Sequence, residues 1–381
     1  MQTDFDVAIV GGGLAGLASA IEMGKAGKRV VLFEKRAYPY HKVCGEYISM
    51  ESWNYLKYLG LPLEEMDLPR IDRLVVSDLK GNLLRHQLPL GGFGISRYTL
   101  DAKLAKLAQE ANVMLLEDCR VEEIRYQSKE DVHRIKSAKG DFSSKLLVAS
   151  YGKRSRLDKQ WNRDFIQKPL PADRNFTGVK YHINSDLAAN QIGLHIFDGG
   201  YCGISKVEGE DRYCFCYLTL ASAVQKAGGI EGLEEKYMRK NAILDQLLDL
   251  PRIYEKPEVI AQVNFNSRSQ IEDHAFMLGD TAGLIVPLCG NGMSMALHAA
   301  HIWSGLAKSY FEDKLDRPMF EQRYKKAWRK QFNARLKVGR SLQTTFYKPK
   351  LSSLLITLLN KSSWLSRSLI SFTHGKEILE D

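Results

Sequence analysis

The chain lacks the features that mark secreted, metal-binding and nucleic-acid-binding proteins. Its six cysteines form no Cys-x-x-Cys pair and no zinc-like spacing, which predicts no metal site and is typical of a reduced, cytoplasmic compartment. Residues 1–5 lead directly into an apolar strand, which leaves no room for a signal peptide, and no internal repeat or low-complexity stretch is present. The basic residues occur without a recognisable nucleic-acid-binding module, so we expect no nucleic-acid partner.

Positive charge is concentrated at the C-terminal end. Residues 322–381 contain 13 Lys and Arg against 3 acids, a balance of +10, so the net charge of +9 leaves about −1 for the rest of the chain. The apolar run at 351–359 is too short to span a bilayer, which needs about 20 residues. A basic helix with an apolar face suits an anionic membrane surface, and the alternative is a helix that packs on its own fold. We expect a cytoplasmic protein, with membrane association through residues 322–381 as one of these two alternatives.

The first of two glycine-rich segments, GGGLAG at residues 11–16, directly follows the apolar strand 7–10. Gly11 permits a tight turn, Gly13 allows backbone to approach a pyrophosphate, and Gly16 lets the following helix pack close to the strand. This pattern is typical of a dinucleotide-binding βαβ unit.

The residues after this turn complete the unit. A helix is expected at 14–26, and its N-terminus would direct N–H groups and a positive dipole end at the phosphates. The strand expected at 29–33 is followed by Glu34, at the position where an acid normally hydrogen-bonds a ribose 2′-hydroxyl and would repel a 2′-phosphate.

The second glycine-rich segment distinguishes FAD from NAD. It begins with Gly279-Asp280 after a strand expected at 275–278, continues through Pro287, and ends with Gly-Asn-Gly at 290–292. A carboxylate at Asp280 suits the hydroxyl groups of a ribityl chain. Backbone N–H groups at the start of a helix over 293–308 could face the part of the flavin that becomes negative on reduction. A nicotinamide enzyme does not need this element, so we predict FAD.

These segments give the chain a specific resemblance, which covers roughly residues 4–340. It resembles the flavoprotein group that includes para-hydroxybenzoate-type aromatic hydroxylases, flavin halogenases and geranylgeranyl reductases. Two further landmarks carry the resemblance: Ile95-Ser96-Arg97, where the group keeps an arginine close to FAD, and Lys42-Val43-Cys44-Gly45-Glu46, which is similar to the Cys-Gly loop of the reductases. The FAD-binding residues implied are Gly11, Gly13, Leu14, Ala15, Gly16, Glu34, Lys35, Arg97, Gly279, Asp280, Pro287, Gly290, Asn291, Gly292 and Met293.

The chain departs from the group in two places. Where the group commonly has Ala-Asp-Gly-x-x-Ser, residues 150–155 keep the glycine and serine but replace the acid by Tyr151. Where the reductases carry Tyr-x-Trp-x-Phe-Pro, residues 201–206 keep Tyr201 and lose the tryptophan and proline. No Trp-x-Trp-x-Ile-Pro segment is present, which disfavours a halogenase.

We predict the α/β class: a Rossmann-like, GR2-type FAD-binding domain, an interleaved antiparallel β-sheet domain for the substrate, and a basic helical C-terminal region. A chain of 381 residues is long for a single core, and strands expected at 177–181, 194–197 and 213–218 supply the second sheet. The FAD-binding domain takes residues 1–80, 95–170 and 265–320, the substrate domain takes 81–94 and 171–264, and the C-terminal region takes 321–381.

The function expected is an FAD-dependent oxidoreductase that takes electrons from NADH or NADPH. The first reading is a monooxygenase that hydroxylates a lipophilic or aromatic small molecule, and the alternative is a reductase of isoprenoid (geranylgeranyl-type) double bonds. The missing tryptophan-proline stretch weighs against the reductase, and the Cys-Gly loop weighs for it. A non-catalytic prenyl-lipid carrier is a remote third reading, because such a carrier should erode the second glycine segment, which is intact here.

The active site is expected between the flavin and the antiparallel sheet, bounded by the Cys44 loop, Tyr201 and the turn at 287–292. A double-bond reductase needs a proton donor as well as hydride, and the candidates for that donor are Cys44, Glu46 and Tyr201. The alternating apolar residues of the sheet suit a hydrophobic substrate pocket.

Overall fold

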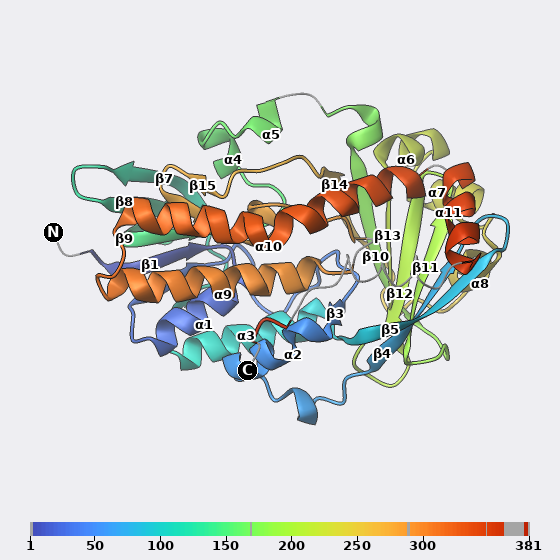
Figure 1. Cartoon of the computed structure of the whole chain (residues 1–381), viewed down its shortest axis with the longest axis horizontal. Coiled ribbons are helices and arrows are strands. Elements are labelled where there is room, and N and C mark those ends of the chain that lie inside the picture. The colour runs from blue at the N-terminus through green and yellow to red at the C-terminus, as the bar shows by residue number, and fades with distance from the viewer. Residues whose placement is uncertain (1–2, 168–169, 288–289, 348, 362–376, 380–381) are drawn as a thin grey trace.

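The structure is a computed structural model that describes residues 3–167, 170–287, 290–347, 349–361 and 377–379. Two sheets lie side by side, each with helices on its outside, and the helix α10 (Arg317–Phe346) runs along both (Figure 1). Two residues of the turn predicted at 287–292, and much of the tail beyond residue 361, lie outside the described residues.

The first sheet has eight strands and contains both ends of the predicted FAD-binding domain. Its central order is β15-β16-β9-β1-β2-β6, in which β16, β9, β1, β2 and β6 are parallel, and β7 and β8 extend it as an antiparallel hairpin beside β9. Its strands are β1 (Phe5–Val10), β2 (Val30–Phe33), β6 (Met114–Leu116), β7 (Val121–Gln127), β8 (Val132–Ser137), β9 (Gly140–Ala149), β15 (Ile271–Glu272) and β16 (Ala275–Met277).

Helices from distant parts of the sequence cover this sheet. α1 packs against both α3 and α9, and α10 packs against α9. One large core cluster joins the strands to these helices. The helices of this half are α1 (Leu14–Lys25), α2 (Trp53–Leu59), α3 (Arg97–Glu110), α4 (Leu157–Gln160), α5 (Asp164–Gln167) and α9 (Gly292–Phe311).

The second sheet has the order β14-β10-β13-β12-β11-β4-β5-β3, and all its neighbours are antiparallel except β11 and β4. Its strands are β3 (Tyr47–Ser49), β4 (Arg70–Ser77), β5 (Leu83–Gly94), β10 (Phe176–Asn184), β11 (Gln191–Phe197), β12 (Gly200–Lys206), β13 (Arg212–Leu220) and β14 (Glu258–Val263). α6 (Ala221–Ala227), α7 (Ile230–Leu233) and α8 (Ala242–Leu248) cover one of its faces.

Two details differ from the elements expected from the sequence. β3 and β4 both belong to the second sheet, where each pairs with β5, although residues 1–80 were predicted to belong to the FAD-binding domain. The sequence also predicts a helix from Leu100 to Ala111, but this helix begins at Arg97, because the Ser96 hydroxyl accepts a hydrogen bond from the Thr99 N–H at 3.1 Å and caps it there.

The C-terminal region packs on the fold over much of its length. Along α10 the aromatic residues Phe320, Tyr324, Trp328 and Phe332 recur every fourth position and are buried in the core of the first half. α11 (Pro349–Lys361) lies beside β5 and β11 of the second sheet. Among the described residues, no helix is both long and apolar enough to cross a membrane.

Candidate functional site

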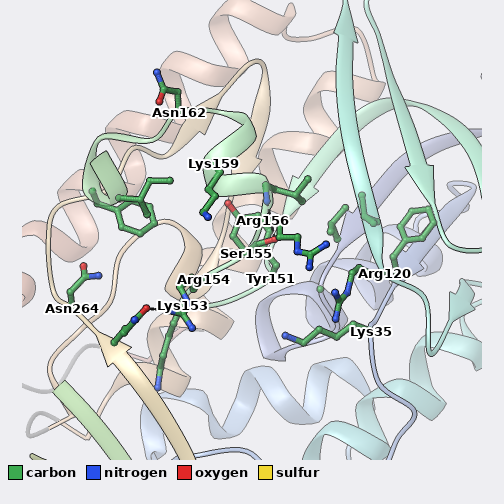
Figure 2. Close-up of a pocket in the computed structure, with 18 of the residues that line it drawn as sticks. Lys35, Arg120, Tyr151, Lys153, Arg154, Ser155, Arg156, Lys159, Asn162 and Asn264 are labelled. Atoms are coloured by element: carbon green, nitrogen blue, oxygen red, sulfur yellow. Dashed lines mark hydrogen bonds between the residues drawn. The ribbon is translucent and has the colours of Figure 1, made fainter. Parts of the chain in front are cut away.

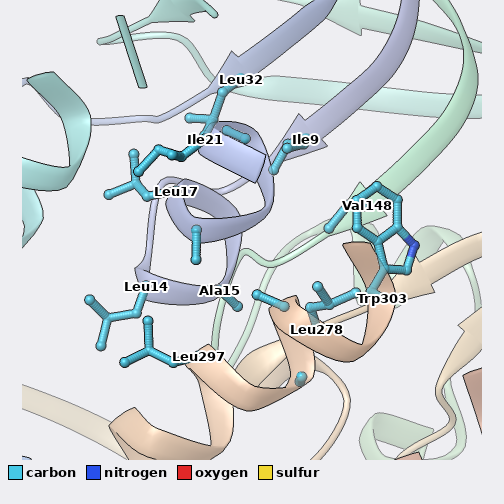
Figure 3. Packing of buried hydrophobic residues seen from close by; sticks show 14 of the residues in the cluster. Ile9, Leu14, Ala15, Leu17, Ile21, Leu32, Val148, Leu278, Leu297 and Trp303 are labelled. Carbon is cyan, nitrogen blue, oxygen red and sulfur yellow. The ribbon is translucent and has the colours of Figure 1, made fainter. Parts of the chain in front are cut away.

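The two glycine segments meet in space although 262 residues lie between them in the sequence. Gly11 has a φ of +108°, and a Cβ added there would lie 2.5 Å from the Ser150 carbonyl oxygen, so only glycine fits this turn. A Cβ added at Gly279 would lie 3.3 Å from the Cβ of Ala15 in α1. Figure 3 shows the apolar packing beside this contact, where Leu14 and Ala15 of α1 face Leu297 and Leu278. One ligand can therefore touch both segments.

The start of α1 has the features of a pyrophosphate site. Its N-cap, Gly13, makes no side-chain capping bond, so the first turn of the helix is not closed by a side chain. A Cβ added at Gly13 would meet nothing nearer than 4.0 Å, where its neighbours are the Arg97 guanidinium and the Ser150 carbonyl oxygen. This open space between a helix N-terminus and an arginine fits a diphosphate.

Glu34 lies at the end of β2, beside the turn. Its buried carboxylate accepts hydrogen bonds from the N–H groups of Gly12 at 2.8 Å and Arg36 at 3.2 Å. The Tyr38 hydroxyl donates to the Gly12 carbonyl at 2.5 Å and covers the same turn. Glu34 is thus where the sequence pattern placed a ribose-binding acid. Tyr38 was not predicted, because a tyrosine four residues after the acid is no part of the glycine pattern.

A cationic groove begins at Glu34 and runs between the two halves of the molecule. The cavity is about 900 Å³, and Gly11, Glu34 and Lys35 line one end of it while Asn175 and Asn264 line the other. Six basic side chains surround it against the single carboxylate of Glu34; they are Lys35, Arg120, Lys153, Arg154, Arg156 and Lys159. Figure 2 shows Lys35 and Arg120 on one side and Lys153 and Arg154 on the other.

Tyr151, which replaces the acid that the group commonly has, belongs to a buried polar chain. Its hydroxyl donates to Asp158 at 2.6 Å, and Asp158 pairs with the buried Arg163 at 3.1 Å. Arg163 in turn donates to the Thr281 carbonyl at 3.0 Å, in the second glycine segment. A carboxylate seven residues later therefore lies behind Tyr151, which contacts it directly.

The second glycine segment lies close to the Cys44 loop. Thr281 exchanges hydrogen bonds with Gly152, and the Asp280 carbonyl accepts one from Arg268 at 2.9 Å. A Cβ added at Gly290 would lie 3.3 Å from the ring of Tyr47, three residues after Cys44. At the start of α9, the buried Ser294 hydroxyl has no hydrogen-bond partner in the described part of the chain. An unpartnered polar atom beside the segment expected to hold the flavin fits a bound cofactor.

Arg97 is held rigidly beside the pyrophosphate turn. Its guanidinium makes two bonds of 2.8 Å to Asp101, and Lys42 binds the same carboxylate at 2.7 Å. Burial alone would raise the pKa of Asp101, but the positive charges of Arg97 and Lys42 lower it. Burial likewise acts to lower the pKa of Arg97, and the charge of Asp101 raises it above its ordinary value. The cluster of two cations and one anion leaves a net positive charge beside the turn.

The Cys44 loop packs directly on the face of the second sheet that α6–α8 leave uncovered. The thiol of Cys214 lies 3.2 Å from the Cys44 carbonyl oxygen, and the Ser205 hydroxyl lies 3.5 Å from that of Gly45. A Cβ added at Gly178 would lie 3.1 Å from Val43. Cys44 itself is half-buried and carries a free thiol.

Glu46 is the centre of a buried ionic network at this contact. Its carboxylate is fully buried and accepts from the Arg97 N–H at 2.9 Å, from Lys180 at 2.7 Å and from His182 at 2.6 Å. Burial would raise its pKa, but the bond from His182 and the charge of Lys180 lower it to about 2. The sequence analysis named Glu46 but not Lys180 or His182. Both alternate with apolar residues along β10, which is also the pattern of a strand with one solvent-exposed face.

Tyr201 lies on the same sheet face as the Cys44 contact, but further along β12. Alternation places Tyr201 and Ser205 on one face, about 13 Å apart along the strand. Tyr201 is buried in an apolar cluster that reaches the second glycine segment through Leu284 and Val286. The structure therefore groups Cys44 with Glu46 and places Tyr201 in a neighbouring apolar region.

The comparisons with known proteins agree with this geometry. Residues 4–167 match the family model described as an FAD binding domain. The chain is 24% identical over 363 residues to digeranylgeranylglycerophospholipid reductase 1 of Methanopyrus kandleri, covering 89% of this chain and 90% of that protein. It is 24% identical over 343 residues to kynurenine 3-monooxygenase of Christiangramia forsetii, covering 82% and 75%.

A solved structure shares the whole fold. It is a geranylgeranyl bacteriochlorophyll reductase-like protein from Thermoplasma acidophilum, with a TM-score of 0.78, 16% identity, and coverage of 98% of this chain and 96% of that one. Fold and matches together define an FAD-dependent oxidoreductase. Within that class, the matches support the predicted resemblance to the flavoprotein group that holds the para-hydroxybenzoate-type hydroxylases and the geranylgeranyl reductases.

Proposed function

We propose that the protein reduces carbon–carbon double bonds of an isoprenoid-type hydrophobic substrate. The observation that carries this proposal is the buried network of Glu46, Lys180 and His182 against the Cys44 loop. Bound FAD would supply hydride once reduced, and the reaction then needs a proton. Groups able to hold and pass a proton lie directly behind the loop that is expected beside the flavin. The match to a digeranylgeranylglycerophospholipid reductase over nearly the full length of both chains supports the same choice.

The residues proposed to hold FAD are those predicted from the two glycine segments. Gly11, Gly13 and the start of α1 would bind the pyrophosphate with Arg97, and Glu34 the adenosine ribose. Asp280 would bind the ribityl chain, and the turn before α9 would face the flavin ring. The open turn at Gly13, the adjacency of Gly279 to Ala15 and the unpartnered Ser294 hydroxyl all support this arrangement.

The substrate is proposed to lie along the apolar cluster that contains Tyr201. Its aromatic and aliphatic members come from the second sheet, from residues 284–286 and, through Tyr347, from the end of α10. Apolar surroundings of this kind favour a hydrocarbon chain over a polar metabolite. Cys44 and Glu46 would then supply and hold the proton at the polar end of this region, and Tyr201 would shape the apolar end.

NADH or NADPH is proposed as the electron donor, and the cationic groove supports this choice. A dinucleotide carries several negative charges, and the groove offers basic side chains from both of its sides, including Arg120 and Arg154. FAD would occupy the end of the groove at Gly11 and Glu34, and the basic side chains at 153–159 are proposed to receive the donor.

Hydroxylation, the first of the two functions expected from the sequence, is the second candidate. The apolar, buried surroundings of Tyr201 favour it, because a hydroxylase needs a pocket from which water is excluded. The sequence match to a kynurenine 3-monooxygenase is consistent with it. A non-catalytic lipid carrier is disfavoured, because the second glycine segment retains its contacts to the first.

A membrane role is proposed for α11. Leu351, Leu354 and Leu358 fall on one side of the helix and are each about half exposed, whereas Ile356 and Leu359 are buried against the second sheet. The surrounding residues 322–381 carry a charge of +10. An exposed apolar stripe within a basic region suits an anionic membrane surface, where a hydrophobic substrate would also be found.

The discriminating experiment is a set of rapid-mixing traces. Flavin bleaching is followed anaerobically after NADH or NADPH is added, and reoxidation is then followed with a geranylgeranylated lipid or with oxygen. A reductase is reoxidised by the lipid without oxygen. A hydroxylase instead consumes oxygen in step with the nicotinamide cofactor, and the lipid alone leaves its flavin bleached.

A further inference from the structure

Four residues from two distant segments of the sequence form a polar path through the contact between the two halves. His41 and Glu46 come from the loop before β3, and Lys180 and His182 from β10. The ligating atoms of His41, Glu46 and His182 all lie within 4.8 Å of one another. Lys180 binds the second oxygen of the same carboxylate at 2.7 Å, so a fixed positive charge already balances Glu46.

The outer end of this path reaches solvent. His41 is half-buried, and its ring stacks on Tyr98 with centroids 4.8 Å apart and lies 5.0 Å from that of Tyr254. Both tyrosines are more than two-fifths exposed. The rings of His41 and His182 are 5.1 Å apart, so the half-buried histidine is in contact with the fully buried one.

Two imidazole nitrogens on this path are buried without a hydrogen-bond partner among the described residues: Nδ1 of His41 and Nδ1 of His182. Because Glu46 is ionised, the Nε2 of His182 must carry the proton of the 2.6 Å bond, which leaves its Nδ1 as an acceptor when the ring is neutral. Buried polar atoms are rarely left without a partner. Here the two unpartnered atoms lie on adjacent rings.

The inner end of the path lies among thiols that hold their protons. Cys214 binds the Cys44 carbonyl, and burial raises the pKa of Cys214 well above its ordinary value and that of Cys216 to about 12. Burial, followed by the charges of Lys180 and His182, lowers the pKa of His41 to about 4, so this ring is neutral near neutral pH. The other charged groups facing the path are Arg97, Asp101, Lys42 and Arg212.

We propose that His41, His182, Glu46 and Lys180 form a proton relay from solvent to the Cys44 side of the flavin site. The relay rests on the proposed function only in the reaction that consumes the delivered proton. When Lys180 gives a proton to the site, the ionised Glu46 takes the Nε2 proton of His182 and passes it on to Lys180. His182 Nδ1 then takes a proton from His41 through a water between the two unpartnered nitrogens. His41 regains its proton from water, so one proton enters and one is consumed. His182 is left with its proton on Nδ1 and exchanges it for one on Nε2 before the next turnover.

The first test needs neither substrate nor turnover. Nitrogen NMR of the histidine side chains is recorded on the full-length protein from pH 4 to 9. We expect a proton on Nε2 of His182, an unprotonated Nδ1, and a His41 that stays neutral down to about pH 4. Lys180→Met should raise the pKa of His41, because one of the positive charges that lower it is removed. A proton on Nδ1 of His182, or resonances that shift when a chelator is added, would overturn the relay, the latter in favour of a metal site.

The second test measures the proton-consuming step itself. His41→Phe keeps the ring stack but cannot carry a proton, so the step should slow about tenfold and recover when imidazole is added as an external proton carrier. His182→Gln keeps a donor to Glu46 and should slow it about 100-fold, the lower end of a general acid's usual contribution. The matched control is His274→Phe, which removes another histidine–carboxylate pair, with Glu321, far from the loop.

The outcomes separate this inference from the proposed function. An unchanged rate in His41→Phe, or a loss that imidazole does not restore, contradicts the relay even if the lipid is reduced. If no lipid is reduced but His182 has the expected tautomer and His41 responds to Lys180→Met, the relay stands and the proposed substrate fails.

Discussion

Replacing Glu46 by glutamine tests the ion pair that joins the Cys44 loop to the second sheet. The amide keeps the size of the side chain and an acceptor for the Arg97 N–H, but it no longer balances Lys180, whose side chain is only 2% exposed. The variant therefore leaves an uncompensated positive charge buried.

The size of the effect follows from the environment of the carboxylate. Lowering the pKa of Glu46 from 4.5 to about 2 corresponds to roughly 3 kcal/mol of stability, at about 1.36 kcal/mol per pKa unit. Removing one partner of a buried pair costs about 3–5 kcal/mol by the independent measure of mutational studies. We expect E46Q to lower the free energy of unfolding by about 3 kcal/mol at pH 7.

Urea unfolding at several pH values measures this difference. Because the pKa of Glu46 is lowered in the folded protein, its stabilisation is complete above about pH 4.5 and is lost as the pH falls toward 2. The difference in unfolding free energy between wild type and E46Q should therefore disappear over that pH range.

Two variants serve as controls. Glu235→Gln removes an exposed ion pair with Arg239 and should cost under about 0.5 kcal/mol. The double variant E46Q/K180M should recover part of the loss. A loss under about 1 kcal/mol at pH 7, or no recovery in the double variant, would refute the reasoning.

Further predictions concern the cofactor, the donor, the substrate and the membrane. Gly11→Ala should lower FAD retained after dialysis by tenfold or more, because the added Cβ would lie 2.5 Å from Ser150, whereas Gly27→Ala, with nothing within 4 Å, should retain it. Arg154→Glu should raise the KM for the nicotinamide cofactor without changing that for the lipid; an equal change in both would contradict the groove assignment. Cys44→Trp should block turnover and leave FAD bound, as judged by flavin absorbance and product formation. Leu354→Asp should weaken sedimentation with anionic liposomes. Wild-type binding that does not weaken as salt is added would contradict the proposed membrane role of the basic region 322–381.

Local patterns predicted the cofactor-binding half of the fold well. The strand, turn and helix around Gly11 each have their own sequence signal, and the structure confirms α1 and β2 where they were expected. The convergence of Gly279 on Ala15 could be inferred because both segments had to serve one FAD. Arg97 was placed through the family resemblance, and its partner Asp101 was not, since a carboxylate four residues along a helix commonly faces solvent.

The polar part of the site could not be predicted in the same way. Lys180 and His182 alternate with Val179 and Tyr181, which is also the pattern of a strand with one solvated face. Only the tertiary contact with Glu46, 134 residues away from Lys180, shows that this face is buried. β4 was placed with the wrong sheet for a related reason, because its pairing with β11 joins segments more than 100 residues apart.

The central claim, hydride transfer to an isoprenoid double bond, is tested most directly by the mass of the product. Enzyme with bleached flavin is mixed anaerobically with a geranylgeranylated lipid, and the lipid is analysed after one turnover. We predict that the flavin is reoxidised and that the lipid gains two hydrogen atoms, one of them from solvent. A lipid left unchanged without oxygen, and gaining one oxygen atom when oxygen is admitted, would contradict the claim and establish a hydroxylase.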